Sequence, residues 1–376
     1  MHILMISRGL PEERYPLNGV FEFDQAMALE KIGVHVTLFS VDLRSLRRKR
    51  KWGIQREQRN GVDCCSISIP VGAVPLDLQI RIGTWALKKL YRNTFQGKKP
   101  DLIHAHFTKT ACMAANLSEE EGIPLVVTEH SSEMAKTEIN EQILRTAQYA
   151  YSRASRVIAV GRFLADNIRK KTGIACTVIP NIMGDKAFFE VNRRKKDDGF
   201  GFVFCGSLIP RKRPLLLLNA FRQLAENDPG IRLGIIGDGE LHDELEKCLH
   251  EWKLDDRVTL FGQLPRKEIA AIYGDYDCFV LPSAGETFGV VYIEALAAGL
   301  PVIATACGGP EEFVSRDVGV VVPVDDQDSL VNAMRWMTEN RGRYNGDCLR
   351  DYVRSRYSPD VVASAIKDVY TSILTQ

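Results

Sequence analysis

The chain has 376 residues, of which 45% are hydrophobic and 26% are charged, as in ordinary soluble globular proteins. Its 49 basic and 48 acidic residues leave a net charge of +1, so nothing in the composition indicates a nucleic-acid partner, and we expect none. The length predicts two domains, and nine cysteines without a CxxC pair predict free thiols in the cytoplasm. Residues 1–7 are too short for a signal peptide, and no apolar run is long enough to span a membrane.

Short apolar runs along the chain predict buried parallel strands, and most of them are separated by segments of helical length and period. In the first half these runs are residues 2–7, 35–40, 102–107, 124–130 and 156–161; in the second half they are residues 201–207, 231–237, 257–262, 278–283, 301–305 and 318–323. Helical segments such as 21–33 and 268–276 lie between them. This alternation predicts doubly wound α/β sheets with right-handed crossovers.

One charged segment, residues 191–200, has no apolar period and falls between the two series of strands. We therefore expect an N-terminal Rossmann-like domain over residues 1–190 and a C-terminal one over residues 198–357, facing each other across a cleft. Ser358 before a proline is typical of a helix start, so residues 359–376 are expected to form a helix that packs back on the first domain.

Two glutamates, Glu286 and Glu294, lie on either side of an apolar turn after one of the predicted strands. Ligands of open α/β sheets bind outside the carboxyl ends of the strands, so Glu286 is expected in a binding loop. The backbone N–H groups near Gly289 and Val290 begin a helix and predict a phosphate site. Glu294 lies on that mostly apolar helix, where it needs hydrogen-bond donors such as sugar hydroxyls; a surface glutamate or a buried ion pair is the alternative.

The stretch ETFGVVYIEALAAGLPVIATACGGPEE, preceded by LPS, resembles the signature of retaining glycosyltransferases of family 4, which have the GT-B fold. The resemblance implies that Glu286 lies against the donor sugar and that Glu294 binds the ribose of the nucleotide. It also implies that the backbone of Phe288, Gly289 and Val290 meets the diphosphate. No metal and no other cofactor is implied.

A basic loop after the strand at 201–207 offers further contacts in the same half. Gly206 is expected to permit a tight turn, and Arg211 and Lys212 can place two positive charges on a diphosphate, although a generic basic loop is the alternative. The family usually has arginine where this chain has Ser207, which makes Arg211 and Lys212 the expected phosphate clamp. Leu264 occupies the place where the family's nucleotide base rests on an apolar side chain.

The first half carries weaker matches to the same family. Asn18 and Gly19 lie in a loop that resembles the family's glycine-containing loop, and they are expected to contact the donor phosphate or the acceptor, with a plain loop as the alternative. His130 matches a histidine that lines the donor sugar in family members. Residues Arg44–Lys51 hold six basic groups, which predict either a solvated loop or a contact with the inner face of a membrane.

The predicted function is a metal-independent, retaining glycosyltransferase that moves a hexosyl group from a nucleotide diphosphate sugar, with UDP-sugars favoured, to a glycan or lipid-linked acceptor. The expected catalytic residues are Glu286, His130, Arg211 and Lys212. The spacing of Asp275 and Asp277 fits a metal-binding DxD motif, but Asp277 leads directly into a buried strand, so no metal is expected. The alternatives are a GT-B nucleotide-sugar epimerase, a phosphorylase, or a non-catalytic sugar-binding subunit.

Overall fold

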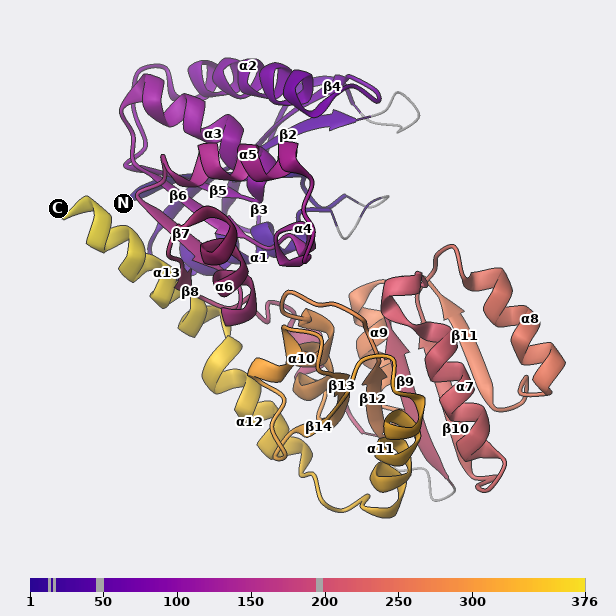
Figure 1. The fold of residues 1–376 in the computed structure, drawn as a ribbon. Helices are drawn as coiled ribbons and strands as arrows, with labels where there is room; N and C mark the ends of the chain where they lie inside the picture. The colour runs from indigo at the N-terminus through magenta and orange to yellow at the C-terminus, as the bar shows by residue number, and fades with distance from the viewer. Residues whose placement is uncertain (13–14, 16–17, 45–50, 194–198, 376) are drawn as a thin grey trace. The chain divides into compact units, whose positions relative to one another are not determined.

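The computed structural model describes residues 1–376 except 13–14, 16–17, 45–50, 194–198 and 376. The chain divides into two compact units (Figure 1). Unit 1 consists of Met1–Gly184 together with Pro359–Gln376, and unit 2 consists of Asp185–Ser358. The first unit is therefore built from both ends of the chain, and the second is inserted between them.

Unit 1 contains an eight-stranded sheet with the order β3-β4-β2-β1-β5-β6-β7-β8. Its strands are β1 (His2–Ser7), β2 (His35–Arg44), β3 (Gly53–Arg59), β4 (Val62–Pro70), β5 (Leu102–His106), β6 (Leu125–Glu129), β7 (Arg156–Ala159) and β8 (Thr177–Val178). All neighbouring pairs are parallel except β3 and β4. The buried strands explain why their sequences are apolar on both faces.

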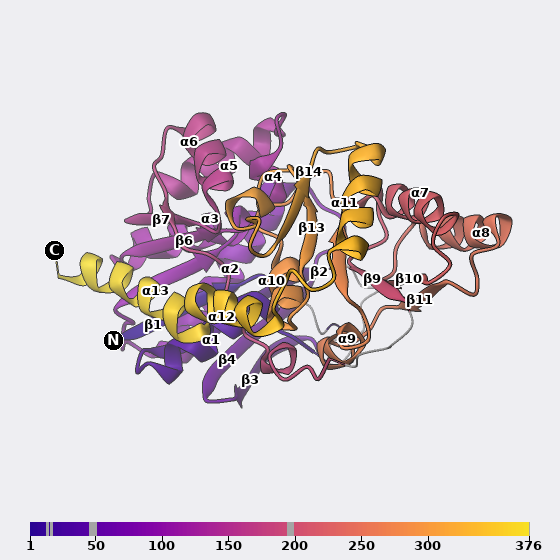
Figure 2. The same ribbon diagram turned by 90° about the horizontal axis from the view of Figure 1, so that it is seen from below.

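The helices of unit 1 are α1 (Val20–Lys31), α2 (Leu76–Phe95), α3 (Thr108–Glu121), α4 (Ser132–Ala135), α5 (Glu141–Tyr151), α6 (Arg162–Thr172) and α13 (Pro359–Leu374). The last of these lies beside α1 in both views (Figures 1 and 2). Lys367 Nζ donates to the carbonyl of Ile32 at 3.2 Å, and Tyr370, fully buried, contributes its ring to the unit 1 core. Within the described ranges, no helix has the length and apolar character needed to cross a bilayer.

Unit 2 contains a six-stranded parallel sheet with the order β11-β10-β9-β12-β13-β14. Its strands are β9 (Phe200–Cys205), β10 (Ile231–Ile236), β11 (Val258–Gly262), β12 (Cys278–Leu281), β13 (Val302–Thr305) and β14 (Gly319–Val322). Its helices are α7 (Pro214–Ala225), α8 (His242–Trp252), α9 (Arg266–Tyr273), α10 (Val290–Ala297), α11 (Gln327–Glu339) and α12 (Gly346–Tyr357), with 3₁₀ turns η1 (Lys186–Phe188), η2 (Pro210–Lys212) and η3 (Pro310–Glu312). The two units are thus two Rossmann-like α/β domains, as the sequence predicts.

All eleven predicted strands overlap strands of the structure, but the β3–β4 hairpin was not predicted as such. Its two-residue turn is Asn60-Gly61, with φ of 48° and 86°. Both residues need positive φ in this kind of hairpin turn, and Asn-Gly is its strongest sequence signal. The signal was therefore present in the sequence, between two strands that are only partly apolar.

The strand order locates one switch point in each sheet, where consecutive crossovers leave in opposite directions. In unit 1 it lies between β1 and β5, and in unit 2 it lies between β9 and β12. Ligands of open α/β sheets bind at the carboxyl ends of the strands that flank such a point. The loops after these four strands are therefore the places where functional side chains should gather.

Candidate functional site

The two loops at the unit 2 switch point meet through a buried ion pair. Lys212, in the 3₁₀ turn after β9, donates from Nζ to Oε1 of Glu286, in the loop after β12, at 2.5 Å. The two side chains are only 13% and 9% exposed. Arg211 Nη1 lies 3.8 Å from the same carboxylate oxygen. One carboxylate therefore faces two cations, and the cluster retains positive charge beyond what Glu286 neutralises.

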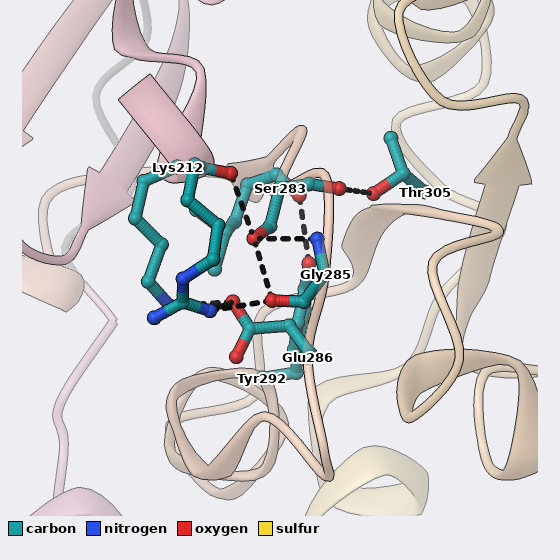
Figure 3. A network of polar contacts seen from close by, with 8 residues as sticks. Lys212, Ser283, Gly285, Glu286, Tyr292 and Thr305 are labelled. Atoms are coloured by element: carbon teal, nitrogen blue, oxygen red, sulfur yellow. Dashed lines mark hydrogen bonds and ion pairs between the residues drawn. The ribbon is translucent and has the colours of Figure 1, made fainter. Parts of the chain in front are cut away.

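The loop that carries Glu286 is held by hydrogen bonds to its own backbone and to Arg211 (Figure 3). The guanidinium of Arg211 donates to the carbonyl of Gly285 at 2.5 Å. The backbone carbonyl of Arg211 accepts a hydrogen bond from the hydroxyl of Ser283 at 3.2 Å. Thr305, at the end of β13, donates to the carbonyl of Ser283 at 2.5 Å. These bonds satisfy the loop from inside the protein and fix the direction in which Glu286 projects.

The helix that follows begins at a glycine that no other residue could easily replace. Gly289 has φ of 89°, and a Cβ there would lie 2.6 Å from the ring of Tyr292. The hydroxyl of Tyr292 donates to the carbonyl of Leu281 at 2.7 Å, which ties α10 to the end of β12. Phe288 is buried against Phe313, so its backbone, and not its ring, remains for a ligand. The N-terminus of α10 thus lies next to Glu286.

Glu294 is 6% exposed on α10, and Oε1 lies 3.4 Å from Nε of Arg266, the first residue of α9. The side chains of this pair are 8% and 16% exposed. The buried carboxylate is therefore partnered by an arginine that the sequence reasoning missed. The buried ion pair that was the alternative is therefore present.

Two other residues predicted for the site in unit 2, Gly206 and Leu264, lie in ordinary surroundings. Gly206 was expected to permit a tight turn; a Cβ at this position would make only ordinary contacts, the nearest with the Phe204 ring at 3.6 Å. The glycine that the turn requires is Gly237, with φ of 139° and a Cβ position 1.9 Å from the carbonyl oxygen of Gly206. Leu264, partly exposed, lies in the loop between β11 and α9, two residues before Arg266. Asp277 accepts from the backbone N–H of Gly201 at 2.8 Å, a structural role.

His130 of unit 1 follows β6 and is fixed by a buried carboxylate. Glu129 is fully buried and accepts from the backbone N–H of His130 at 2.8 Å and from the hydroxyl of Tyr151 at 2.6 Å. The Nε2 atom of His130 lies 3.0 Å from Nδ1 of His106, within hydrogen-bond distance. Burial, followed by the charge of nearby Arg8, lowers the pKa of His130, so its imidazole is neutral at pH 7.

A further charged pair lies in unit 1 between Arg8, in the loop after β1, and Glu22, in the first turn of α1. Arg8 lies 4.3 Å from the ring centroid of Phe107, and its Nε is 3.8 Å from Oε1 of Glu22. Glu22 is fully buried, neither oxygen has a hydrogen-bond partner among the described residues, and burial raises the pKa of its carboxyl group. The sequence reasoning missed both charged residues, because they are separated by a loop and only the fold makes them neighbours.

Asn18 and Gly19 belong to this same end of unit 1. Gly19 begins α1 with φ of 71°, and a Cβ there would lie 2.0 Å from the carbonyl oxygen of Gly9. Asn18 Nδ2 donates to the carbonyl of Leu10 at 3.4 Å. Both predicted residues therefore lie in a tightly packed loop beside β1. Of the predicted basic segment Arg44–Lys51, residues 45–50 lie outside the described part of the chain.

The structure thus divides the predicted site residues between the two units. Arg211, Lys212, Glu286 and Gly289 lie together at the switch point of unit 2. Glu294 follows on the same helix as Gly289. His130, Asn18 and Gly19 lie in unit 1.

Comparison with known proteins accounts for both units. Residues 20–183 match the family described as Glycosyltransferase Family 4, and residues 185–350 match Glycosyl transferases group 1. A putative teichuronic acid biosynthesis glycosyltransferase of Bacillus subtilis is 27% identical over 99% of both chains.

Solved structures share the fold over nearly the whole chain. A sucrose-phosphate synthase from Thermosynechococcus elongatus has a TM-score of 0.81 at 21% identity, covering 100% of this chain and 99% of the other. Anabaena HepE, solved in complex with UDP-glucose, has a TM-score of 0.74 at 20% identity, covering 99% and 100%. The fold is therefore GT-B, and the chain belongs to the glycosyltransferases, with a Glycosyltransferase Family 4 half followed by a group 1 half.

Proposed function

We propose that the chain is a retaining, metal-independent hexosyltransferase that takes a UDP-sugar as donor and a glycan or lipid-linked molecule as acceptor. The observation that carries this proposal is the buried Lys212–Glu286 pair, at 2.5 Å, between the loops after β9 and β12. Burying two charges costs free energy that their mutual attraction often repays only in part, so the pair adds little stability by itself and is better explained by binding of a ligand. A diphosphate would take the positive charge of Lys212 and Arg211 and leave Glu286 for the sugar.

The leaving group defines the chemistry in this proposal. As the acceptor hydroxyl bonds to the anomeric carbon and the bond from that carbon to the diphosphate breaks, negative charge grows on the departing oxygen, and the leaving phosphate takes up the proton of the hydroxyl. Lys212 and Arg211 stabilise that charge, together with the N–H groups at the start of α10. Because these groups are already fixed by the loop hydrogen bonds, they need little rearrangement during the reaction. This fixed positive charge is what supports a mechanism without a metal.

The glutamates recognise the two neutral parts of the donor. Glu286 accepts hydrogen bonds from hydroxyls of the hexose, and Glu294 accepts them from the ribose. Arg266 holds the Glu294 carboxylate in place until the ribose arrives. His130, neutral and fixed by Glu129 and His106, is the proposed contact of unit 1 with the donor sugar. Glu286 is assigned an orienting role and not that of a nucleophile.

Three features support the cellular setting that we propose. All nine cysteines are free, and burial raises the pKa of several, such as Cys64 to about 12, which suits a reducing cytoplasm. The basic segment Arg44–Lys51 is the proposed contact with an anionic membrane. The Bacillus subtilis relative named for teichuronic acid biosynthesis supports a surface polysaccharide as the acceptor.

Replacing Arg47, Arg48, Lys49 and Arg50 by glutamine should weaken binding to anionic vesicles, and unchanged binding would reject the membrane contact.

Calorimetric titration of UDP, GDP and ADP tests the donor, and NMR of the product tests the reaction. We expect UDP to bind most tightly, and we expect transfer from a UDP-hexose to octyl glycosides to continue in EDTA with the anomeric configuration retained. An inverted product or a loss of activity in EDTA would overturn those parts of the proposal. Turnover of the donor with water alone to an epimer would indicate an epimerase, and UDP binding without turnover of any donor would indicate a non-catalytic subunit.

A further inference from the structure

A recessed surface lies in unit 1, along α2, α3 and α5, which lie side by side (Figure 1). Its volume is about 1370 Å³, which exceeds the roughly 300–1,000 Å³ of pockets for drug-sized ligands. Its lining on α2 extends from Asp77 to Asn93, or roughly 24 Å at the rise of an α-helix. This surface, which we call the helical groove, is therefore suited to an extended chain and not to a compact ligand.

The helical groove combines an exposed aromatic ring with hydrogen-bonding side chains. Trp85, on α2, is 57% exposed, although a large apolar side chain is costly to leave in water. Tyr149, on α5, donates to the amide oxygen of Asn116, on α3, at 3.1 Å. Thr84 adds a buried hydroxyl that has no hydrogen-bond partner in the described part of the chain. An apolar ring beside fixed polar groups is the arrangement that binds the apolar face and the hydroxyls of a sugar.

The charges of the helical groove favour an anionic occupant. Its lining holds five cations, Arg81, Lys88, Lys89, Arg92 and Arg145, and three carboxylates, Asp77, Glu120 and Glu141. Glu120 pairs with both Lys88 and Arg92, and Glu141 pairs with Arg145 at 2.5 Å. Arg81 and Lys89 form no ion pair with any residue that the structure describes, and the Lys89 ammonium lies 5.1 Å from the ring centroid of Trp85.

From these observations we propose that the helical groove is a binding site for an acidic oligosaccharide, separate from the donor site of unit 2. A sugar ring stacks on Trp85, and Arg81 and Lys89 bind its carboxylate or phosphate groups. A flat membrane is a poorer fit, because the surface is recessed and its three carboxylates would meet anionic lipid headgroups. Resting on the proposed transferase function, such a site would hold an acidic acceptor glycan on the enzyme between additions.

Calorimetry with full-length protein tests this inference, with a hyaluronan hexasaccharide as the acidic probe and maltohexaose as its neutral counterpart. We expect the hexasaccharide to bind at least about tenfold more tightly than maltohexaose. Trp85→Ala should weaken binding of the hexasaccharide about tenfold, and so should the double variant that carries both Arg81→Ala and Lys89→Ala. The control is Trp52→Ala, which removes another exposed tryptophan, 43% exposed and outside the groove, and should leave the affinity unchanged.

The inference is overturned if the hexasaccharide does not bind, or if Trp52→Ala weakens it as much as Trp85→Ala does. It is also overturned if Trp85→Ala abolishes binding to vesicles that contain phosphatidylglycerol but leaves hexasaccharide binding intact, since that result assigns the groove to a membrane. UDP titration of the same variants gives an independent reading of the donor site. It should be unchanged in every variant, so the groove and the proposed transferase function can fail separately.

Discussion

Replacing Glu286 by glutamine should destabilise unit 2 and make its stability depend strongly on UDP. The change leaves Lys212, 13% exposed, and Arg211 without their shared carboxylate. Removing one partner of a buried ion pair costs about 3–5 kcal/mol, and we expect about 3 kcal/mol here because the new carboxamide oxygen still accepts from Lys212. For a unit of this size, that corresponds to a fall in Tm of about 6–12 °C.

Differential scanning calorimetry with and without saturating UDP measures both effects. In the native protein the diphosphate competes with Glu286 for Lys212, whereas in the variant it supplies the missing negative charge. The rise in Tm on adding UDP should therefore be several degrees larger for Glu286→Gln than for the native protein. The matched control is Glu246→Gln, which changes an exposed glutamate of α8 and should shift Tm by less than about 1 °C. An unchanged Tm in Glu286→Gln, or equal UDP shifts in both proteins, would refute the role assigned to the ion pair.

Four further outcomes are expected. Lys212→Met should weaken UDP binding by about 10- to 150-fold in calorimetry, the loss of one charge-assisted contact of about 1.5–3 kcal/mol. Glu294→Gln should weaken UDP but not 2′,3′-dideoxy-UDP, whereas equal losses would argue against a ribose contact. Tyr370→Phe removes the hydroxyl that bonds His104 Nδ1 at 2.5 Å, and urea denaturation should give a loss of about 1–3 kcal/mol. Burial lowers the pKa of His104 to about 3, so between pH 6.5 and pH 3 only the unfolded chain takes up a proton at this residue. The contribution of neutral His104 to the free energy of unfolding is therefore complete above pH 6.5 and falls by about 1.4 kcal/mol per pH unit towards pH 3. His104→Gln should reduce this dependence of stability on pH.

The parts of the fold that could be predicted are those whose signal is local. Buried parallel strands are short apolar runs, and Gly289 before an apolar helix marks a turn that only glycine adopts easily. The remaining part of the fold depends on strand order, which is not a local signal, because a parallel crossover connects positions that are distant along the chain. The loops after β9 and β12 are 74 residues apart at Lys212 and Glu286, yet the family resemblance pointed to both.

The residues that were missed are those whose role depends on contacts between elements. Arg266 reads as a surface residue at the start of a helix, and only the packing of α9 against α10 makes it the partner of Glu294. Arg8 and Glu22 likewise become a pair only when α1 folds back on the end of β1. Gly206 was predicted to permit a tight turn, but the close contact there involves a second glycine, Gly237, just after the next strand, where a Cβ would collide with the carbonyl of Gly206. A local sequence pattern can identify a loop, but it cannot show which side chain from another element will contact that loop.

The chain leaves the ribosome with its N-terminus first, yet the two units cannot complete their folding in the order in which they begin to be synthesised. The core of unit 1 includes Val362, Ala363, Ile366 and Tyr370, all from the last helix. Unit 2 is complete at Ser358, before that helix has been synthesised. The inserted unit can therefore finish folding first, while the half that is synthesised first keeps an apolar stripe of α1 uncovered until α13 has been synthesised. A nascent chain stalled at Ser358 should consequently recruit chaperones to its beginning and not to its middle.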